Sequence, residues 1–264
     1  GYFMKKLRLT VWSEGLDPKL EPKAVYLFPD DINTYLASFL KENQDMEVSV
    51  HSQSEPDNGL SQEILDNTDV LVWWSHLYDQ KLSDEAAARV VEAVLNGMGL
   101  LLLHSSMGSK PARILLGKSS NTGKYREVGE LERVWAVNRS HPILAGLEKE
   151  YIDIPVSEMY GEPYGMPTPD DVVFISWFEG GEVLRSGVSW HKGAGKIFLF
   201  TPGHEEFPVY TIPEIQQVIT NAVRWLTPVT GPQMHFAGNL GNVEPLSPIT
   251  TEPYEETWKR MQNQ

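Results

Sequence analysis

The chain has 264 residues, a formal net charge of −14 and 41% hydrophobic residues, so it can bury a sizeable core. It shows none of the clustered Lys and Arg that nucleic acids and anionic membranes attract, and we expect neither as a partner. It contains no cysteine, which excludes disulfides, zinc–thiolate sites, iron–sulfur clusters and cysteine nucleophiles.

Strand and helix patterns alternate along the first part of the chain. Apolar or β-branched runs predict buried strands at residues 7–12, 46–51, 70–74 and 100–103. Helical spacing of apolar residues predicts two helices, one over 32–40 capped by Asp30 or Asp31 and one over 85–95 capped by Ser83. This alternation is typical of βαβ units in a parallel sheet, with the wholly apolar 100–103 strand near the centre.

The second part of the chain changes character. Strand-like runs follow one another at 135–138, 151–156, 172–177, 183–190 and 196–200. Glycine pairs at 180–181 and 193–195 favour tight turns between them, so we expect β-hairpins. Pro213 then opens a helix that ends before Pro228.

The last part of the chain is rich in Pro, Gly, Asn and Thr and has little periodicity. We therefore expect an α/β domain over residues 4–227 and an extension over 228–264 that packs on it or on a neighbouring subunit of a homo-oligomer. No apolar run approaches the roughly 20 residues that span a bilayer. No apolar segment follows Met4, taken as the natural start, so we expect no secretory signal and a cytoplasmic location.

Three histidines follow predicted strands at the end where parallel sheets bind ligands. His76 comes after the 70–74 strand, His104 directly after 100–103, and His204 shortly after 196–200. Imidazole is a common metal ligand, and three histidines with the carboxylate of Glu158 would suit zinc or another divalent metal. The alternative is that each histidine is hydrogen-bonded and structural, since no short-range metal motif such as HExxH is present.

Two carboxylates are candidates for proton transfer at such a site. Glu158 follows the 151–156 strand, and Glu205 directly follows His204. Either could act as the general acid or base beside the metal, and His104 could share that role. The alternative is that both carboxylates simply face water.

Aromatic residues accompany the same strand ends. Aromatic faces with nearby carboxylates are what a polyhydroxylated sugar needs, so we assign candidate substrate contacts to a set of five. They are Trp12, Trp74, Tyr78, Tyr160 and Trp190. The alternative for each is core packing, which we expect for Trp73, with Trp74 on the opposite face of its strand.

The turn after the 100–103 strand resembles a nucleophile elbow only weakly. Leu103 and Met107 flank Ser105, where an elbow needs small residues, so we assign no serine nucleophile. Three basic residues, Lys110, Lys118 and Arg126, could bind an anionic group near this turn or could be surface charges.

Several blocks together resemble the trehalose-utilisation, ThuA-like family. They are VLVWWSH at 70–76, NGMGLLLLHS at 96–105, SHPILAG at 140–146, EMYGEP at 158–163, FISWFEGGEVLRS at 174–186, PGHE at 202–205 and NAVRW at 221–225. The resemblance implies a class I glutamine amidotransferase-like fold, a flavodoxin-like three-layer α/β/α sandwich with a mostly parallel central sheet and additional β-hairpins. The amidotransferase cysteine would fall near Ser105, so glutaminase activity is not implied for this chain.

Two hypotheses for function follow. The resemblance implies a role in the use of trehalose or related disaccharides, and its motif residues match His76, His104, Glu158 and His204. The first hypothesis is a metal-dependent isomerase, lyase or hydrolase, most simply a zinc enzyme, acting on a sugar or keto-sugar. The second is a non-catalytic sugar-binding or regulatory protein on an amidotransferase-like scaffold. The sequence leaves open the substrate, the reaction, the metal and the oligomeric state.

Overall fold

A computed structural model describes residues 5–117, 123–229, 244–245 and 254–263. Its contacts divide the chain into two units, residues 1–232 and 233–264. The described helix of the second unit is α7 (Tyr254–Gln262), and most of the extension expected at 228–264 lies outside the described residues. No helix in the described ranges is long and apolar enough to cross a membrane.

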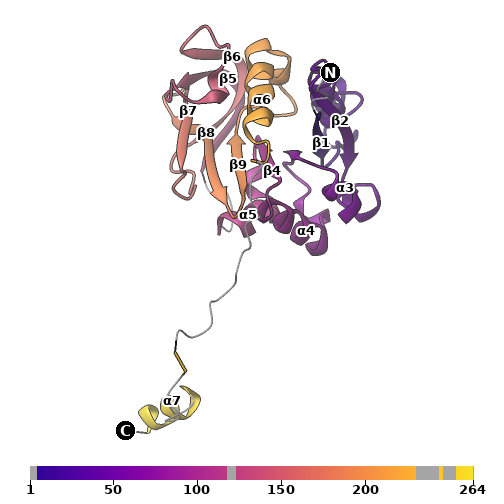
Figure 1. The fold of residues 1–264 in the computed structure, drawn as a ribbon. Helices are drawn as coiled ribbons and strands as arrows, with labels where there is room; N and C mark the ends of the chain where they lie inside the picture. The colour runs from indigo at the N-terminus through magenta and orange to yellow at the C-terminus, as the bar shows by residue number, and fades with distance from the viewer. Residues whose placement is uncertain (1–4, 118–122, 230–243, 246–253, 264) are drawn as a thin grey trace. The chain divides into compact units, whose positions relative to one another are not determined.

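The first unit is built on one nine-stranded sheet (Figure 1) with the order β2-β1-β3-β4-β9-β8-β7-β5-β6. The strands are β1 (Leu7–Ser13), β2 (Met46–Ser52), β3 (Val70–Trp74), β4 (Gly99–Leu103), β5 (Lys124–Ala136), β6 (Tyr151–Gly161), β7 (Asp171–Phe178), β8 (Val183–Lys192) and β9 (Gly195–Phe200). Its α-helices are α1 (Pro22–Leu27), α2 (Ile32–Leu40), α3 (Gln62–Asp66), α4 (Asp84–Leu95), α5 (Lys110–Leu116) and α6 (Pro213–Trp225).

The sheet is mixed, so the expectation of a mostly parallel sheet is wrong. The pairs among β2, β1, β3, β4 and β9 are parallel, whereas those among β9, β8, β7, β5 and β6 are antiparallel. The physical reason is the length of the connections. Turns as short as Gly193–Ala194 join β8 to β9, and only an antiparallel partner can be reached over such a distance.

Helices cover both faces of the parallel half of the sheet, which gives the expected three layers there. Side chains of α2 and α6 share one buried cluster with Val72, Trp74 and Leu103, and side chains of α3, α4 and α5 share the other with Leu71 and Trp73. Adjacent strand residues point to opposite faces, so Trp73 and Trp74 lie in different clusters, as predicted. β4 lies between β3 and β9 and is buried throughout.

Several elements differ from the sequence prediction. β5 begins at Lys124 rather than at residue 135, because its first part is polar and mostly exposed and forms no apolar run that would mark a strand. β6 continues to Gly161, so Glu158 and Tyr160 lie within a strand and not in a loop after it. The short helices α1, α3 and α5 were not predicted, since 5 to 7 residues carry too little periodicity to be read.

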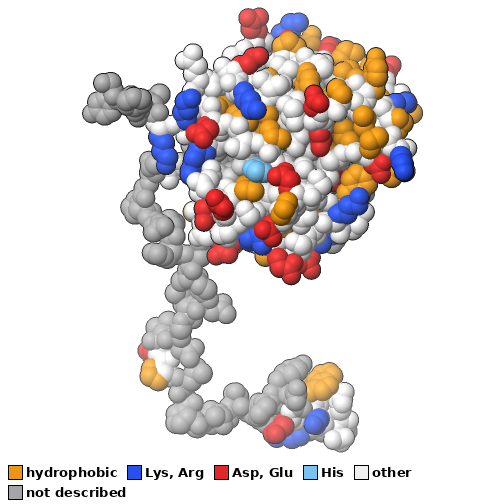
Figure 2. Space-filling model, turned by 90° about the vertical axis from the view of Figure 1, so that its right-hand side faces the viewer, with side chains coloured by type: hydrophobic (Ala, Val, Ile, Leu, Met, Phe, Trp, Pro, Cys, Tyr) orange, Lys and Arg blue, Asp and Glu red, His pale blue; other side chains and the backbone are white. Residues whose placement is uncertain are grey.

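The charged surface shows no single dominant patch on the face drawn in Figure 2. Lys and Arg side chains are interspersed there with Asp, Glu and apolar groups. The expectations of no nucleic-acid and no membrane partner, and of a possible homo-oligomer, stay predictions.

Candidate metal centre

Three neighbouring strands bring the three predicted histidines together. β3, β4 and β9 pair in parallel, so their carboxyl ends meet at one edge, where His76, His104 and His204 follow them. His104 has a left-handed backbone conformation with φ of 57°, which few side chains other than Gly, Asn and Asp adopt readily. Its backbone N–H donates to the carbonyl of Phe200 on β9 at 2.9 Å, which holds the turn in place.

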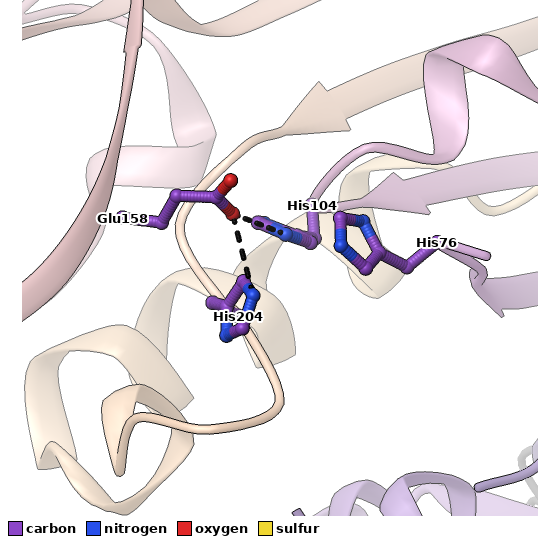
Figure 3. Close-up of side chains that lie close together, drawn as sticks. All are labelled: His76, His104, Glu158 and His204. Atoms are coloured by element: carbon purple, nitrogen blue, oxygen red, sulfur yellow. Dashed lines mark ion pairs between the residues drawn. The ribbon is translucent and has the colours of Figure 1, made fainter. Parts of the chain in front are cut away.

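Glu158 completes the cluster from the antiparallel half of the sheet. One ligand atom from each of His76, His104, Glu158 and His204 lies within 4.8 Å of all the others, as Figure 3 shows. Oε2 of Glu158 is 3.1 Å from Nε2 of His104 and 3.7 Å from Nε2 of His204. His104, His204 and Glu158 are buried, and His76 is partly exposed.

Hydrogen bonds decide which imidazole nitrogen each histidine offers. Nδ1 of His104 lies 3.0 Å from the carbonyl oxygen of Thr201, so it carries a proton and leaves Nε2 to face Glu158. Nδ1 of His76 lies 2.5 Å from the hydroxyl of Ser105, which leaves its Nε2 free of hydrogen bonds within the described residues. These two rings therefore present Nε2 as a ligand atom.

His204 is set differently. Its Nδ1 accepts the backbone N–H of Glu206 at 3.0 Å, so its proton is on Nε2, which lies 3.0 Å from a carboxylate oxygen of Glu127. Metal coordination through Nε2 requires this proton to leave. Oε2 of Glu205 lies 3.6 Å from Nδ1, beyond hydrogen-bonding distance. Glu127, His204 and Glu206 also form a second group with metal-ligand spacing, which shares His204.

Burial and mutual repulsion keep two of the histidines neutral. Burial, together with the charge of His104, lowers the pKa of His76 and of His204 to about 3. Burial also lowers the pKa of His104, but the contact and charge of Glu158 and the charge of Glu205 outweigh it, and the net pKa is raised. His104 thus carries the positive charge that balances Glu158 when no cation lies between them.

The donor set fits a divalent first-row metal. Oε2 of Glu158 is buried and makes no hydrogen bond of good geometry, although it lies close to two imidazoles. Such an oxygen is costly to bury unless a donor or a cation meets it. Three imidazoles and one carboxylate are the ligands that zinc and related ions take in proteins.

Comparison with known proteins shows the family of this chain. A family model described as trehalose utilisation, ThuA, matches residues 8–226. This chain belongs to the ThuA family. The match confirms the resemblance seen in the sequence motifs. No curated protein matches the sequence.

Solved structures show the same fold. A ThuA-like protein from Parabacteroides merdae is 12% identical, with a TM-score of 0.62 over 84% of this chain and 90% of that one. A ThuA-like protein from Bacteroides uniformis is 14% identical, with a TM-score of 0.59 over 86% and 94%. A glutamine amidotransferase from Thermotoga maritima is 11% identical, with a TM-score of 0.52 over 84% and 99%. At such identities the likeness shows the fold alone, and it confirms the amidotransferase-like architecture implied by the sequence.

The elbow of this ThuA-family protein carries a histidine. The left-handed residue after β4 is His104, one position before Ser105, where the sequence resemblance put the amidotransferase cysteine. The hydroxyl of Ser105 lies within hydrogen-bonding distance of His76 and of the Ser75 carbonyl, at 2.5 and 3.3 Å. Ser105 therefore orients a candidate ligand.

Two of the five aromatic residues predicted to contact substrate pack in the core away from the metal centre. Trp12 stacks on Trp73 with ring centroids 3.9 Å apart and is fully buried. Trp190 pairs with Ile197 at the start of β9, at the opposite end of that strand from His204, and its indole N–H donates to the Thr168 carbonyl. Neither offers a ring face to a ligand at the metal centre, because both rings are covered by packing.

Three other predicted aromatics do lie at the centre. The ring of Trp74 is nearly parallel to that of His104, 6.3 Å away, and its N–H donates to the Gly203 carbonyl at 3.1 Å. The hydroxyl of Tyr160 is 3.2 Å from Nε2 of His104. Tyr78 donates its hydroxyl proton to Glu21 at 2.9 Å. All three side chains are buried, so they form the wall of the site and leave little ring surface for a ligand to contact.

Two carboxylates at the centre were missed in the sequence. Glu127 lies in the polar, mostly exposed first part of β5, which carries no alternating apolar pattern that could have marked a strand. Glu21 precedes α1 in a Pro-containing segment with no readable signal, yet it is only 4% exposed. Glu205, which was predicted, is 3% exposed, and burial raises its pKa to about 8.

Proposed function

We propose that this ThuA-family protein is a divalent-metal-dependent enzyme acting on a sugar or keto-sugar. The observation that carries the proposal is the convergence of His76, His104, His204 and Glu158 on one point at the carboxyl edge of the sheet. The family description, trehalose utilisation, supports a sugar substrate. A cytoplasmic location fits this role and stays a prediction.

The proposed ligands are the Nε2 atoms of His76 and His104, a nitrogen of His204 and Oε2 of Glu158, with zinc as the expected ion. When bound, such an ion supplies Lewis-acid polarisation of a carbonyl oxygen or activation of water. The protein contributes orientation through Thr201 and Ser105, and it excludes bulk water by burying three of the four ligands.

Glu205 is the group best placed to move a proton. Its Oε1 is 4.0 Å from Nε2 of His76, and its Oε2 is buried without a hydrogen bond. A pKa raised to about 8 leaves it mostly protonated at neutral pH, which suits an acid that can act as a base once it has given up its proton. Proton movement next to a polarised carbonyl is common to isomerisation, hydration and elimination, so an isomerase, a lyase and a hydrolase all fit the proposal.

The test is metal analysis of protein purified without a histidine tag. We expect about one zinc ion per chain in the wild type. His104→Asn removes the ligand but keeps a residue type that tolerates the left-handed backbone, and we expect it to lose the ion. His191→Asn is the matched control, since His191 is exposed, pairs with Asp170 and lies at the other end of the sheet. Substoichiometric metal that is the same in all three proteins would refute the proposal.

A non-catalytic sugar-binding role is the second candidate, favoured by the absence of cysteine from the elbow. Calorimetry and product analysis with trehalose and its 3-keto derivative separate the two. Turnover by the metal-loaded protein eliminates the non-catalytic role, and tight binding without turnover favours it.

A further inference from the structure

Two buried carboxylates beside the proposed metal ligands each have an oxygen without a hydrogen-bond donor. They are Oε1 of Glu21 and Oε2 of Glu205, on side chains 4% and 3% exposed. The hydroxyl of Tyr210, on a fully buried side chain, also has no partner among the described residues. Buried polar atoms in native proteins nearly always meet a protein group, water or ligand, so these oxygens can take part in hydrogen bonds with a bound molecule.

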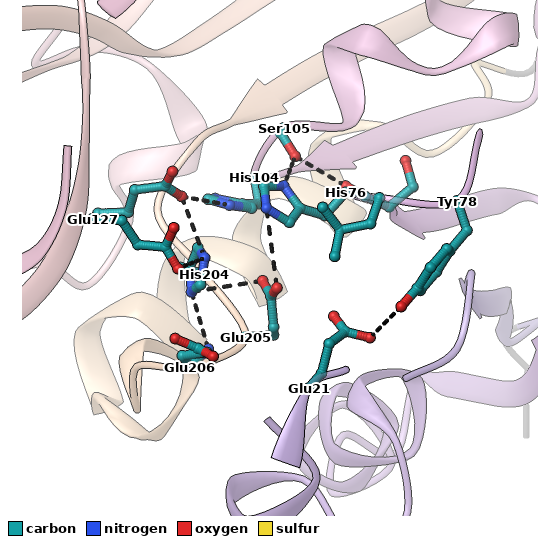
Figure 4. Close-up of polar contacts among 12 residues, drawn as sticks. Glu21, His76, Tyr78, His104, Ser105, Glu127, His204, Glu205 and Glu206 are labelled. Atoms are coloured by element: carbon teal, nitrogen blue, oxygen red, sulfur yellow. Dashed lines mark hydrogen bonds and ion pairs between the residues drawn. The ribbon is translucent and has the colours of Figure 1, made fainter. Parts of the chain in front are cut away.

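The protein fixes the position of the Glu21 carboxylate without giving its Oε1 atom a hydrogen-bond donor. Oε2 of Glu21 accepts the hydroxyl of Tyr78 and the backbone N–H of Asp17, both at 2.9 Å, which fixes the carboxylate and leaves Oε1 open. Figure 4 shows the carboxylates of Glu21 and Glu205 on the same side of the His76 ring, with the hydroxyl of Tyr78 pointing at Glu21 from the right.

Glu14, a third buried carboxylate nearby, shows the contrast. It accepts the backbone N–H groups of His76, Leu77 and Tyr78 at 2.7 to 2.9 Å and is fully engaged in holding that loop. A carboxylate used for structure is thus saturated with donors, whereas Glu21 and Glu205 keep acceptor capacity.

Most of the ionisable side chains around this space are carboxyls, and the positive charge of His104 is already faced by Glu158. Glu14, Glu127, Glu158 and Glu206 lie close to the same histidines. No Lys or Arg among the described residues forms an ion pair with Glu21, Glu158 or Glu205.

The basic residues considered from the sequence as anion ligands are engaged elsewhere. Lys110 pairs with Asp84, and Arg126 pairs with Glu130 and Glu182. Lys118 lies outside the described residues. A phosphate or carboxylate group entering the space would meet several carboxylates, and the positive charges nearby already face carboxylates: His104 faces Glu158, and the charge of Lys23 acts on Glu127. A hydroxyl, in contrast, can donate to the open oxygens.

We propose that the site selects uncharged, unphosphorylated sugars, and that Glu21 and Glu205 bind them by accepting hydrogen bonds from their hydroxyl groups. This inference rests on the proposed function, because it concerns the substrate of the same site. It adds Glu21 as a specificity-determining residue and excludes sugar phosphates as substrates.

The test compares trehalose with trehalose 6-phosphate by calorimetry at neutral pH, on the full chain with and without added zinc. We expect trehalose to bind at least about tenfold more tightly than its phosphate, a difference of about 1.4 kcal/mol. Glu21→Gln, which keeps the shape and removes the charge, should weaken trehalose binding about three- to tenfold and narrow the preference over the phosphate. Its zinc stoichiometry should not change, because Glu21 is not among the proposed ligands.

Glu63→Gln is the matched control, since it removes one exposed charge on α3 and should alter neither affinity. The inference is overturned if trehalose 6-phosphate binds as tightly as trehalose or more tightly. It is also overturned if the Glu21→Gln variant binds both sugars like the wild type, or if the zinc-loaded protein binds neither sugar. If the proposed metal centre is wrong, zinc will not bind, and this is measured independently of sugar binding. The preference for trehalose over trehalose 6-phosphate, measured without zinc, still tests the present inference.

Discussion

The ring of His104 is oriented by the carbonyl oxygen of Thr201, which lies 3.0 Å from Nδ1. Thr201 is itself held by β8, because its backbone N–H donates to the Ser186 carbonyl at 3.0 Å. The junction of the parallel and antiparallel halves of the sheet thus fixes the tautomer that points Nε2 of His104 at Glu158. Outer contacts of this kind set the orientation and basicity of metal-binding histidines.

Zinc binding should displace few protons. His76 and His204 have pKa values of about 3 and are already neutral at pH 5, whereas His104 has a raised pKa and must lose its proton to coordinate an ion. Glu205, with a pKa of about 8, can release at most one more. We therefore expect the logarithm of the zinc dissociation constant to fall by one to two per pH unit between pH 5 and 6, as measured by competition with a chelator of known affinity.

Three ordinary histidines would give a slope close to three in the same range, because each would be largely protonated. A slope of three would contradict the arrangement of charges described above. Repeating the titration on Glu205→Gln isolates the proton of His104, and the slope should then approach one.

The loop that carries His204 depends on the absence of a side chain at Gly203. Its φ is +136°, and a Cβ there would lie 2.0 Å from the hydroxyl oxygen of Tyr210. Gly203→Ala therefore combines backbone strain with overlap in the core, and we expect a loss of at least about 2 kcal/mol in the free energy of unfolding. Urea denaturation of the chelator-treated protein measures it, and zinc affinity should fall as well because His204 moves with the loop.

Gly97→Ala separates the two causes. Gly97 has a φ of +125° with nothing within 4 Å of the Cβ position, so its substitution introduces the strain alone and should cost about 1 to 3 kcal/mol. Combining Gly203→Ala with Tyr210→Ala should cost less than the sum of the two single changes, because the small side chain removes the overlap. Strict additivity would show that Tyr210 is not what the alanine meets.

The histidine cluster could be predicted because a general rule places it. Once 70–74, 100–103 and 196–200 are recognised as parallel strands, the residues that follow them must share one edge. The long apolar run of β4 and the regular spacing in α4 are strong local signals, and their boundaries were predicted within a residue or two. Glu158 was predicted from its residue type and from the resemblance, not from its position in β6.

The remaining site residues could not be predicted, for different physical reasons. Glu127 lies in a strand whose sequence is mostly polar, so no hydrophobic pattern marked it. Glu21 precedes a helix of 6 residues in which Ala24 is the buried side chain, so no apolar periodicity marks that segment. Trp12 and Trp190 fit a sugar site by residue type, but a large aromatic is equally suited to the core, and only the packing distinguishes the two.

Glu132 should make the stability of the protein depend on pH. It is 1% exposed, and burial raises its pKa to about 7 although the hydroxyls of Ser157 and Ser176 donate to it at 2.7 and 2.5 Å. Its pKa in the unfolded chain is near 4.5, so between pH 4.5 and 7 the folded state holds a proton that the unfolded state has lost. Stability therefore falls as the pH rises through this range, by about 3 kcal/mol for a change of this size.

Glu132→Gln removes this titration. The free energy of unfolding of the variant, minus that of the wild type, should increase by up to about 3 kcal/mol as the pH rises from 5 to 8. Urea denaturation of chelator-treated protein at both pH values measures this difference. Glu130→Gln is the control on the same strand, since Arg126 holds the pKa of Glu130 below its usual value and both states are ionised above about pH 5.5. Its difference from the wild type should stay nearly constant as the pH rises from 5.5 to 8. If Glu132→Gln behaves the same way, the carboxyl of Glu132 is ionised in the folded protein and the donated hydrogen bonds outweigh its burial.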